Sequence, residues 1–142
     1  MRSIIALCLT ILFGNLAQAQ TKGVKFVDGL SWKQVKERAQ AENKFIFVEL
    51  FATWCGPCQY MSNEIFPLEQ VGQPINQNFI SVRVQMDSTE SDNANIKKWY
   101  ADARAISNEY NIQSFPTFLI FNPDGQVVHR IVGASDAPEF VG

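Results

Sequence analysis

The apolar segment from Phe45 to Phe51 constrains the fold more than any other part of the chain. Its only charged residue is Glu49, and a strand that is apolar on both faces is typical of the centre of a sheet covered by helices on two sides. The pentapeptide Trp54-Cys55-Gly56-Pro57-Cys58 follows almost at once. Because Pro57 suits the first turn of a helix, we expect the strand to lead into a helix through the two cysteines. The sequence therefore predicts an α/β protein.

Cys55 and Cys58 form a reactive pair in preference to a structural one. Two cysteines separated by two residues can close a small disulfide and reopen it. A loop this short removes little entropy from the unfolded chain, and small exported domains that depend on disulfides usually carry more pairs. These two cysteines and the lone His129 do not complete a four-ligand zinc site. We therefore expect no metal and no bound cofactor, and we place His129 on the surface of the last strand.

Residues 1–19 have the pattern of a secretory signal peptide that is cleaved before Gln20. Arg2 supplies a positive start, residues 4–13 are almost wholly apolar, and Ala17-Gln18-Ala19 places small residues where a signal peptidase reads. The alternative is a permanent membrane anchor, but the apolar run is shorter than the ~20 residues that cross a bilayer. We expect the mature protein to be periplasmic or secreted.

Cys8 lies inside this apolar stretch, too early for a lipid attachment site, so we expect it to leave with the signal peptide. Residues 20–142 are enough for one domain with one core. The chain has 12 basic and 14 acidic residues, a net charge of −2, and no basic tract. Nucleic acid and anionic membrane surfaces are therefore poor candidates for partners. We expect a monomer.

The remaining pattern predicts a helix, strand, helix, strand, helix and hairpin in that order, with parallel and antiparallel pairing mixed in one sheet. The helix after the cysteines should turn Met61 and Ile65 inward and end near Pro67. The other expected elements are a helix within Asp28–Asn43 capped by Ser31, a strand at Phe79–Met86, an exposed loop at Asp87–Asn95, one or two helical segments between Ile96 and Tyr110, and strands at Thr117–Phe121 and Gln126–Val132 around the turn Asn122–Gly125.

With these elements in place, the chain resembles the thioredoxin family over essentially all of residues 20–142. The resemblance rests on the Trp54–Cys58 motif and the strand before it, on Phe115-Pro116-Thr117, on Pro123-Asp124-Gly125 and on Val132-Gly133-Ala134. It implies a thioredoxin fold, which is a central mixed β-sheet flanked by helices. With the signal peptide, the chain looks most like the exported thioredoxin-like proteins of Gram-negative bacteria.

The chain departs from the family pattern in four places. Glu49 stands where thioredoxins usually have a buried Asp, and Arg83 stands where many have a Lys that can approach that carboxylate. Residues 87–105 are longer than usual and predict a helical insertion before the strand that follows Pro116. The sequence ends at Gly142, where the final helix should begin, so that helix is short or truncated.

The resemblance assigns the two thiols different roles. Cys55, on the solvent side of the turn and near the first amides of the helix, is the expected nucleophile, with a pKa below its usual value. Cys58 is the expected resolving thiol, which releases the reduced partner. Gly56 and Pro57 accompany the reducing members of the family. Trp54 either shields the site and contacts partners or belongs to the core.

Glu49 and Pro116 complete the expected site. A carboxylate in so apolar a strand should have a raised pKa, and beneath the disulfide it could accept the proton of Cys58 through a water molecule. The alternative is a purely structural pair with Arg83. The resemblance implies a cis bond before Pro116, with the backbone at Phe115 free to pair with an extended substrate.

These assignments imply an exported thiol–disulfide oxidoreductase, most simply a reductase of disulfide-containing client proteins that is recharged by a membrane-borne thiol reductant. A disulfide oxidase or isomerase would differ in reduction potential more than in residues. A binding or chaperone-like module with an idle disulfide is the alternative outside enzymology, because the aromatic surface at Trp54 and Phe115 would serve it.

Export is directly testable. After expression of the full chain in a Gram-negative host, mass spectrometry of the exported protein should give a polypeptide that begins at Gln20. Retention of Cys8, or a lipid attached to it, would overturn the signal-peptide assignment.

Overall fold

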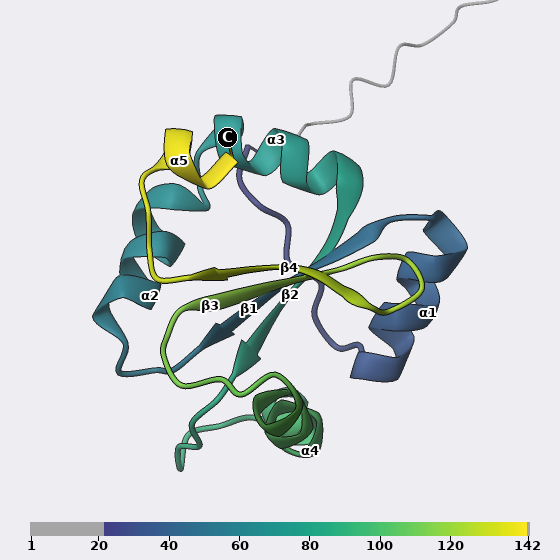
Figure 1. Cartoon of the computed structure of the whole chain (residues 1–142). Coiled ribbons are helices and arrows are strands. Elements are labelled where there is room, and N and C mark those ends of the chain that lie inside the picture. Colours follow the sequence, from purple (N-terminus) through teal and green to yellow (C-terminus); the bar gives the residue numbers. More distant parts are fainter. Residues whose placement is uncertain (1–21, 142) are drawn as a thin grey trace, which may run out of the picture.

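The computed structural model describes residues 22–141, so the predicted signal peptide lies outside the described residues. Within them the chain builds one mixed sheet in the order β2-β1-β3-β4 (Figure 1). The strands are β1 (Phe45–Phe51), β2 (Phe79–Gln85), β3 (Thr117–Phe121) and β4 (Val127–Val132). β1 pairs parallel with β2 and antiparallel with β3, and β3 pairs antiparallel with β4. The predicted mixed sheet and thioredoxin fold are confirmed.

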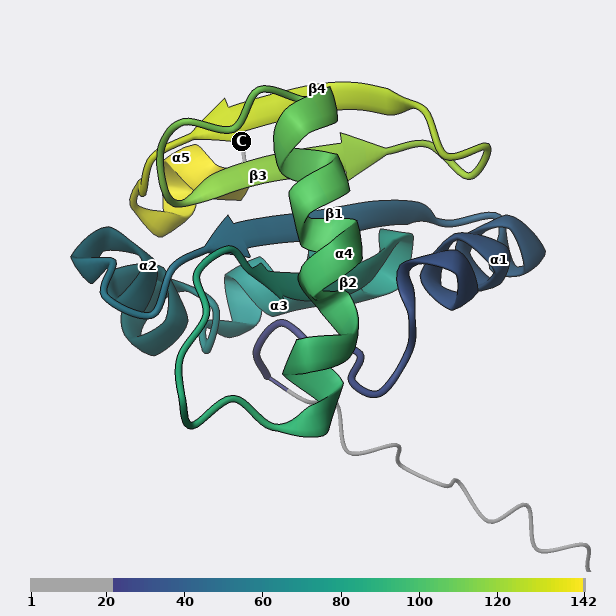
Figure 2. The same cartoon turned by 90° about the horizontal axis from the view of Figure 1, so that it is seen from below.

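Helices cover both faces of this sheet (Figure 2). α1 (Trp32–Glu42) and α4 (Ala94–Glu109) pack on one face, where they share a core cluster with β1, β2 and β3. The π-helical turn η1 (Met61–Ile65), α3 (Glu69–Asn78) and α5 (Ala137–Val141) pack on the other face. α2 (Gly56–Tyr60) leads into η1. In this part of the chain no helix is long and apolar enough to cross a membrane.

The alternation of β1 decides which residue meets which layer, because successive side chains in a strand point to opposite faces. Ile46, Val48 and Leu50 join the cluster of α1 and α4. Phe47 joins the cluster of η1, α3 and α5, and Glu49 shares its face. Glu49 is completely buried, with 0% of its surface exposed. The carboxylate of Glu49 therefore lies on the face of the sheet that packs against η1, α3 and α5.

Local signals in the sequence located most elements well. Ser31 caps α1 as predicted and forms a capping box with Gln34, and η1 ends two residues before Pro67. α1 begins at Trp32, later than Asp28, because Gly29 has a left-handed φ of 75° and Ser31 is the cap. The insertion is a single helix, α4, capped by Asn93.

The structure corrects the sequence analysis at α3, which no pattern predicted. This helix contains Gly72 and Pro74, two residues that weaken a helix interior. Val71 and Ile75 are buried in the core cluster that this helix shares with the sheet, and Gly72 is buried beside Gly23. Tertiary packing therefore outweighs the local preference, and a full helix precedes β2.

The segment after β2 was also predicted wrongly in one respect. The loop was expected to be exposed, but Asp92 is buried. Its carboxylate accepts hydrogen bonds from the hydroxyl and amide of Thr89, the hydroxyl of Tyr100 and the side-chain amide of Gln85. These bonds, the Thr89 hydroxyl first, hold the pKa of Asp92 well below its usual range. The loop is thereby fixed to β2 and α4.

The N-terminal segment crosses α3 at a backbone contact that only glycine allows. Gly23 and Gly72 meet where the segment runs over the helix, and the amide of Val24 donates to Phe66 O at 2.8 Å. A Cβ atom on Gly72 would lie 2.3 Å from the carbonyl carbon of Gly23. The helix and the segment cannot keep this position with any side chain at residue 72.

Gly72→Ala should therefore destabilise the fold. Alanine favours a helix by about 1 kcal/mol over glycine, but the clash is with backbone and costs roughly 1–3 kcal/mol or detaches the segment. Urea unfolding should show a net loss, whereas Gln73→Ala, at an exposed position of the same helix, should not. Equal stability of the two variants would contradict the close contact.

Candidate active site

The structure closes Cys55 and Cys58 into a disulfide at the end of β1, with the two Sγ atoms 2.10 Å apart. Cys55 is the N-cap of α2, and its Sγ accepts the amide N–H of Cys58 at 3.2 Å. Gly56 and Pro57 form the exposed outer part of the turn. Cys55 was expected on the solvent side, but its exposed fraction is only 3%, against 1% for Cys58. The closed disulfide packs against Ala52, with Phe51 and Phe115 beside it, which covers both sulfur atoms.

The turn that carries the cysteines is anchored from the end of the neighbouring strand. Asp87 follows β2, and its carboxylate accepts the backbone amide of Thr53 at 3.0 Å and the Thr53 hydroxyl. The side chain of Gln59 donates to the carbonyl of Thr53 at 3.2 Å. The sequence analysis missed this anchor. Its signal was available, because parallel strands end at the same edge of a sheet and Asp87 follows β2 as Thr53 follows β1.

Two aromatic residues border the disulfide. The side chain of Trp54 is 72% exposed, so the alternative of a core tryptophan is wrong. Its ring meets that of Phe115 edge-on, with the centroids 6.0 Å apart. The bond between Phe115 and Pro116 is cis, as predicted, and the carbonyl of Pro116 accepts the amide of Gly133 at 2.8 Å. The five predicted residues Trp54, Gly56, Pro57, Phe115 and Pro116 thus belong to one region around the disulfide.

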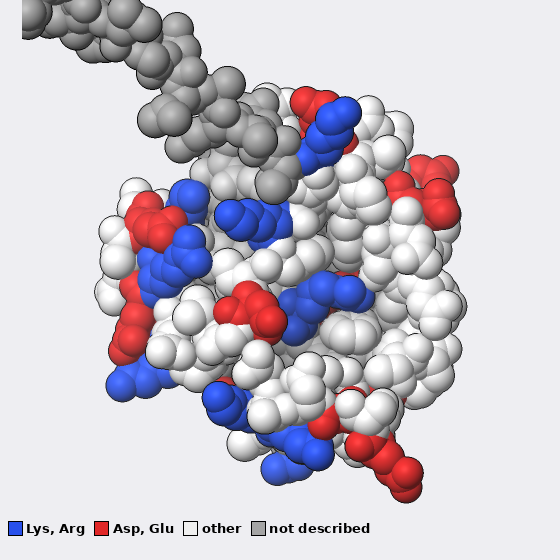
Figure 3. All heavy atoms as spheres, turned by 180° about the vertical axis from the view of Figure 1, so that it is seen from behind, with Lys and Arg blue, Asp and Glu red and all other residues white. Residues whose placement is uncertain are grey.

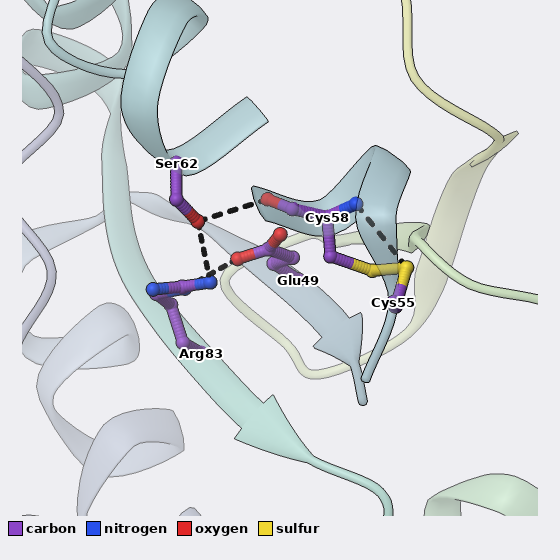
Figure 4. Close-up of polar contacts among 5 residues, drawn as sticks. All are labelled: Glu49, Cys55, Cys58, Ser62 and Arg83. Carbon is purple, nitrogen blue, oxygen red and sulfur yellow. Dashed lines mark hydrogen bonds and ion pairs between the residues drawn. A yellow bond between two sulfur atoms is a disulfide. The ribbon is translucent and has the colours of Figure 1, made fainter. Parts of the chain in front are cut away.

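A chain of polar contacts runs from Glu49 to the turn of Cys58 (Figure 4). Arg83, in register with Glu49 on β2, donates its Nε to Oε2 of Glu49 at 2.5 Å. Its Nη2 donates to Oγ of Ser62 at 2.7 Å. The Ser62 hydroxyl in turn donates to the carbonyl oxygen of Cys58 at 3.0 Å. The sequence analysis foresaw the pair of Glu49 and Arg83 but not the part played by Ser62.

A comparison with protein families identifies the fold independently of this geometry. The family model of the thioredoxin-like domain matches residues 32–142. The chain belongs to the thioredoxin-like family. A thioredoxin-like protein of Synechocystis sp. is 36% identical over 98 residues, which make up 69% of this chain and 76% of that protein. The chloroplastic thioredoxin Y of Oryza sativa subsp. japonica is 30% identical over 105 residues, 74% of this chain and 52% of that protein. The chain thus spans about half the length of this relative.

Solved structures agree with the assignment. The solution structure of a putative disulphide-isomerase from Bacteroides thetaiotaomicron is 34% identical with a TM-score of 0.68, covering 87% of this chain and 91% of that one. A thioredoxin from Thermus thermophilus superimposes with a TM-score of 0.65 over 84% of this chain and 82% of its own at 18% identity, which shows the fold alone. This thioredoxin-like domain therefore has a pair of cysteines that forms a disulfide, consistent with thiol–disulfide exchange.

The electrostatics of this thioredoxin-like site centre on Glu49. Burial raises the pKa of Glu49, and the charge and hydrogen bond of Arg83 oppose the rise without overcoming it. Oε1 of Glu49 has no hydrogen-bond partner in the described residues. Glu49 is thus both paired with Arg83 and removed from solvent, and its role as a proton acceptor for Cys58 stays a prediction. A carboxylate in this setting can take up a proton more readily than an exposed one.

Metal binding finds no support in the same region. Within residues 22–141 no three His, Cys, Asp or Glu side chains lie close enough together to hold a metal ion. His129 lies on the exposed part of β4.

Glu49→Gln should change stability in a pH-dependent way whose sign reports the pKa. Because the folded-state pKa of Glu49 lies above the unfolded value near 4.5, the stability contributed by Glu49 is present below that value and is lost as pH rises through the folded-state pKa. As pH rises above 4.5, the wild type should therefore lose stability relative to Glu49→Gln, so that the difference in free energy of unfolding moves in favour of the variant.

The matched control is Glu64→Gln, which makes the same carboxyl-to-amide change at an exposed residue of η1. Urea unfolding at several pH values measures both differences. A difference for Glu49→Gln that moves in favour of the wild type with rising pH would mean that the Arg83 pair outweighs burial.

Proposed function

We propose that this thioredoxin-like protein is an exported enzyme that reduces disulfide bonds in client proteins by dithiol–disulfide exchange. The observation that carries the proposal is the Cys55–Cys58 disulfide at the capped start of α2. Its position beside the exposed Trp54 ring supports contact with a macromolecular partner. No bound cofactor is needed, because the two thiols supply both electrons.

Cys55 is the nucleophile in this proposal. As the N-cap, its sulfur already accepts the amide of Cys58, and the same donor would stabilise a thiolate at that position. The Cys55 thiolate attacks one sulfur of the client disulfide. A mixed disulfide forms, and the other client sulfur leaves as a thiolate that takes a proton from solvent.

Cys58 completes the exchange. Its thiol gives its proton to the carboxylate of Glu49 through a water molecule, and the resulting thiolate attacks Sγ of Cys55. The bond between Cys55 and the client breaks, and the second client sulfur leaves as a thiolate that takes a proton from solvent, while Glu49 later gives up the proton that it received from Cys58. The client has then gained two electrons and two protons, and the Cys55–Cys58 disulfide is restored. The burial of Glu49 on the η1 side of β1 supports this general-base role.

The client would bind along the exposed turn. Trp54, Gly56 and Pro57 are all exposed, and Phe115 packs beside the disulfide. A client segment passing between Trp54 and the loop at Pro116 would bring its disulfide to Cys55. Sustained reduction needs a source of thiols, which we assign to a membrane-borne reductant, in keeping with the predicted export.

Isomerisation is the second candidate function, because the solved structure at 34% identity is that of a putative disulphide-isomerase. An oxidase, an isomerase and a reductase share these residues and differ in reduction potential. Equilibrating the protein with glutathione buffers measures that potential, and a reductase requires a value close to that of thioredoxin, about −270 mV. A value near −120 mV, as in strongly oxidising relatives, would contradict reduction as the physiological direction.

The two cysteines should behave differently when they are changed singly. Cys58→Ser should accumulate clients as mixed disulfides through Cys55, because attack still occurs while release does not. Cys55→Ser should trap almost none, because in this proposal the remaining thiol, Cys58, attacks Sγ of Cys55 and not the client. Non-reducing gels of extracts that contain each variant make the comparison.

Reduction of insulin by the wild-type protein provides the matching activity measurement, and both variants should lose it. Equal trapping by the two variants would reverse or abolish the assignment of roles. A wild-type protein that neither reduces insulin nor traps clients would leave the binding module with an idle disulfide as the better description.

A further inference from the structure

We propose that Ser62 is a positioning residue that holds the Arg83 guanidinium between Glu49 and Cys58, and so ties the counter-charge of Glu49 to the turn that carries the resolving cysteine. The inference concerns the same centre as the proposed function, but its main measurement is made on the oxidised protein and needs no turnover.

The hydrogen bonds around Ser62 have only one consistent direction. A guanidinium can only donate, so Arg83 donates to the Ser62 oxygen at 2.7 Å. The hydroxyl has a single proton, which points to the carbonyl of Cys58 at 3.0 Å. A serine in a helix often bonds the carbonyl four residues earlier, but here the same oxygen also receives a charged donor. That second bond gives Ser62 a part in the ion pair.

Besides its two hydrogen bonds, the Arg83 guanidinium contacts two aromatic rings. Phe51 lies under the guanidinium with its ring centroid 4.4 Å from Cζ, and Phe26 lies 5.7 Å away. The side chain nevertheless keeps 32% of its surface exposed. It borders a cavity of about 200 Å³ that Phe51 and Trp99 also line. Without the bond to Ser62, the guanidinium has room to turn toward this cavity and away from Glu49.

This cavity lies beside β2, an edge strand of the sheet, and Figure 3 shows the side of the molecule opposite to that of Figure 1. On that face basic and acidic side chains are interspersed, with no continuous patch of either sign. The surface therefore offers no strong field to replace a displaced counter-charge.

The ionisation of Glu49 depends on few neighbours. β2 presents Arg83, and β3 presents the uncharged Phe118 in register with Glu49. α2 presents Cys58, whose thiol titrates once the disulfide is reduced. The acidic residue of η1, Glu64, is exposed, and the buried residues of α3 on this face are apolar. Arg83 is thus the cation whose position controls the proton affinity of Glu49.

An arginine suits this position because its planar group carries separate donors that can reach two acceptors at once. Nε serves Glu49 while Nη2 serves Ser62. A lysine has one ammonium group and would hold one contact at the expense of the other. Ser62 and Arg83 are therefore coupled, and a change at either residue should raise the titration midpoint of Glu49.

The test follows the Glu49 carboxyl of the oxidised full-length protein by NMR titration with ¹³C-labelled glutamate. Loss of an ordinary net hydrogen bond corresponds to roughly half to one pH unit in a titration midpoint. Ser62→Ala should raise the titration midpoint of Glu49 by about that much, whereas Ser62→Thr, which keeps the hydroxyl, should restore it. Asn63→Ala, at an exposed neighbour in η1, should leave the midpoint unchanged.

Arg83→Lys provides a second route that does not depend on the Ser62 variant alone. The midpoint should rise in Arg83→Lys, and Ser62→Ala should add little in that background, because coupled residues are not additive. An unchanged midpoint in Ser62→Ala, or full additivity with Arg83→Lys, overturns the inference. A Ser62→Ala protein that melts earlier with an unmoved midpoint also overturns it, since that result describes a merely structural serine.

Kinetics separate this inference from the proposed function. In stopped flow with dithiobis(nitrobenzoate), attack by Cys55 releases one coloured thiolate and resolution by Cys58 releases the other. Below the titration midpoint, Ser62→Ala should slow the second release about threefold to tenfold and leave the first unchanged. If Glu49→Gln leaves the second release unaltered while Ser62→Ala still moves the midpoint, the general-base role fails and the positioning role stands. If Glu49→Gln slows the second release and Ser62→Ala leaves the titration midpoint unchanged, the general-base role stands and the positioning role fails.

Discussion

A carboxylate buried in the central strand is the constraint around which this domain is arranged. β1 is hydrogen-bonded on both edges and covered on both faces, so Glu49 has no route to solvent of its own. Moving an isolated charge into such a place costs several kcal/mol even after the surroundings relax. The chain offsets part of this cost with one cation, Arg83, which its register on β2 places directly beside Glu49.

The same sheet brings the distant parts of the active site together. β1 and β2 are parallel and end at one edge, where Asp87 meets Thr53. β3 is antiparallel to β1 and pairs Thr117 with Leu50, so β3 begins where β1 ends. The segment before β3 contains Phe115 and therefore reaches the disulfide. Three segments far apart in the sequence therefore meet at one edge of the sheet: those of Thr53, Asp87 and Phe115. The direction of each strand, and not the distance along the sequence, decides where these segments lie.

Sequence reasoning succeeded where a signal was local and failed where packing decided. The apolar run of β1, the capping box at Ser31 and the Asn122–Gly125 turn each specify structure within a few residues, and each was found. α3 was missed because Pro74 and Gly72 argue against a helix, while its stability comes from burial against a sheet that the local pattern does not reveal.

The candidate site divides in the same way. The resemblance identified the cysteines, Glu49 and the cis bond before Pro116, because short motifs carry them. The depth of Cys55 was predicted wrongly, since the residues that cover it come from the end of β1 and from the distant segment before β3. Ser62 carried no signal at all. A serine on a helix is ordinary in sequence, and its contact with Arg83 arises only when η1 packs over β2.

The two faces of the sheet differ in where they bury charged groups. The face under α1 and α4 is apolar throughout its core cluster. The other face is apolar at Phe47 and Phe118 but is interrupted at Glu49, toward the end of β1 that leads to the disulfide.

Replacing a buried ion pair by apolar residues of similar volume is often neutral or stabilising, so stability alone gives no reason for Glu49 and Arg83. A second carboxylate oxygen without a partner makes the arrangement less favourable still. A group that is costly to keep charged, placed one layer below a thiol that must lose a proton, is what a proton acceptor for that thiol requires. The expense of burial is thus the physical basis of the proposed chemistry, because the same desolvation that weakens the fold raises the proton affinity of Glu49.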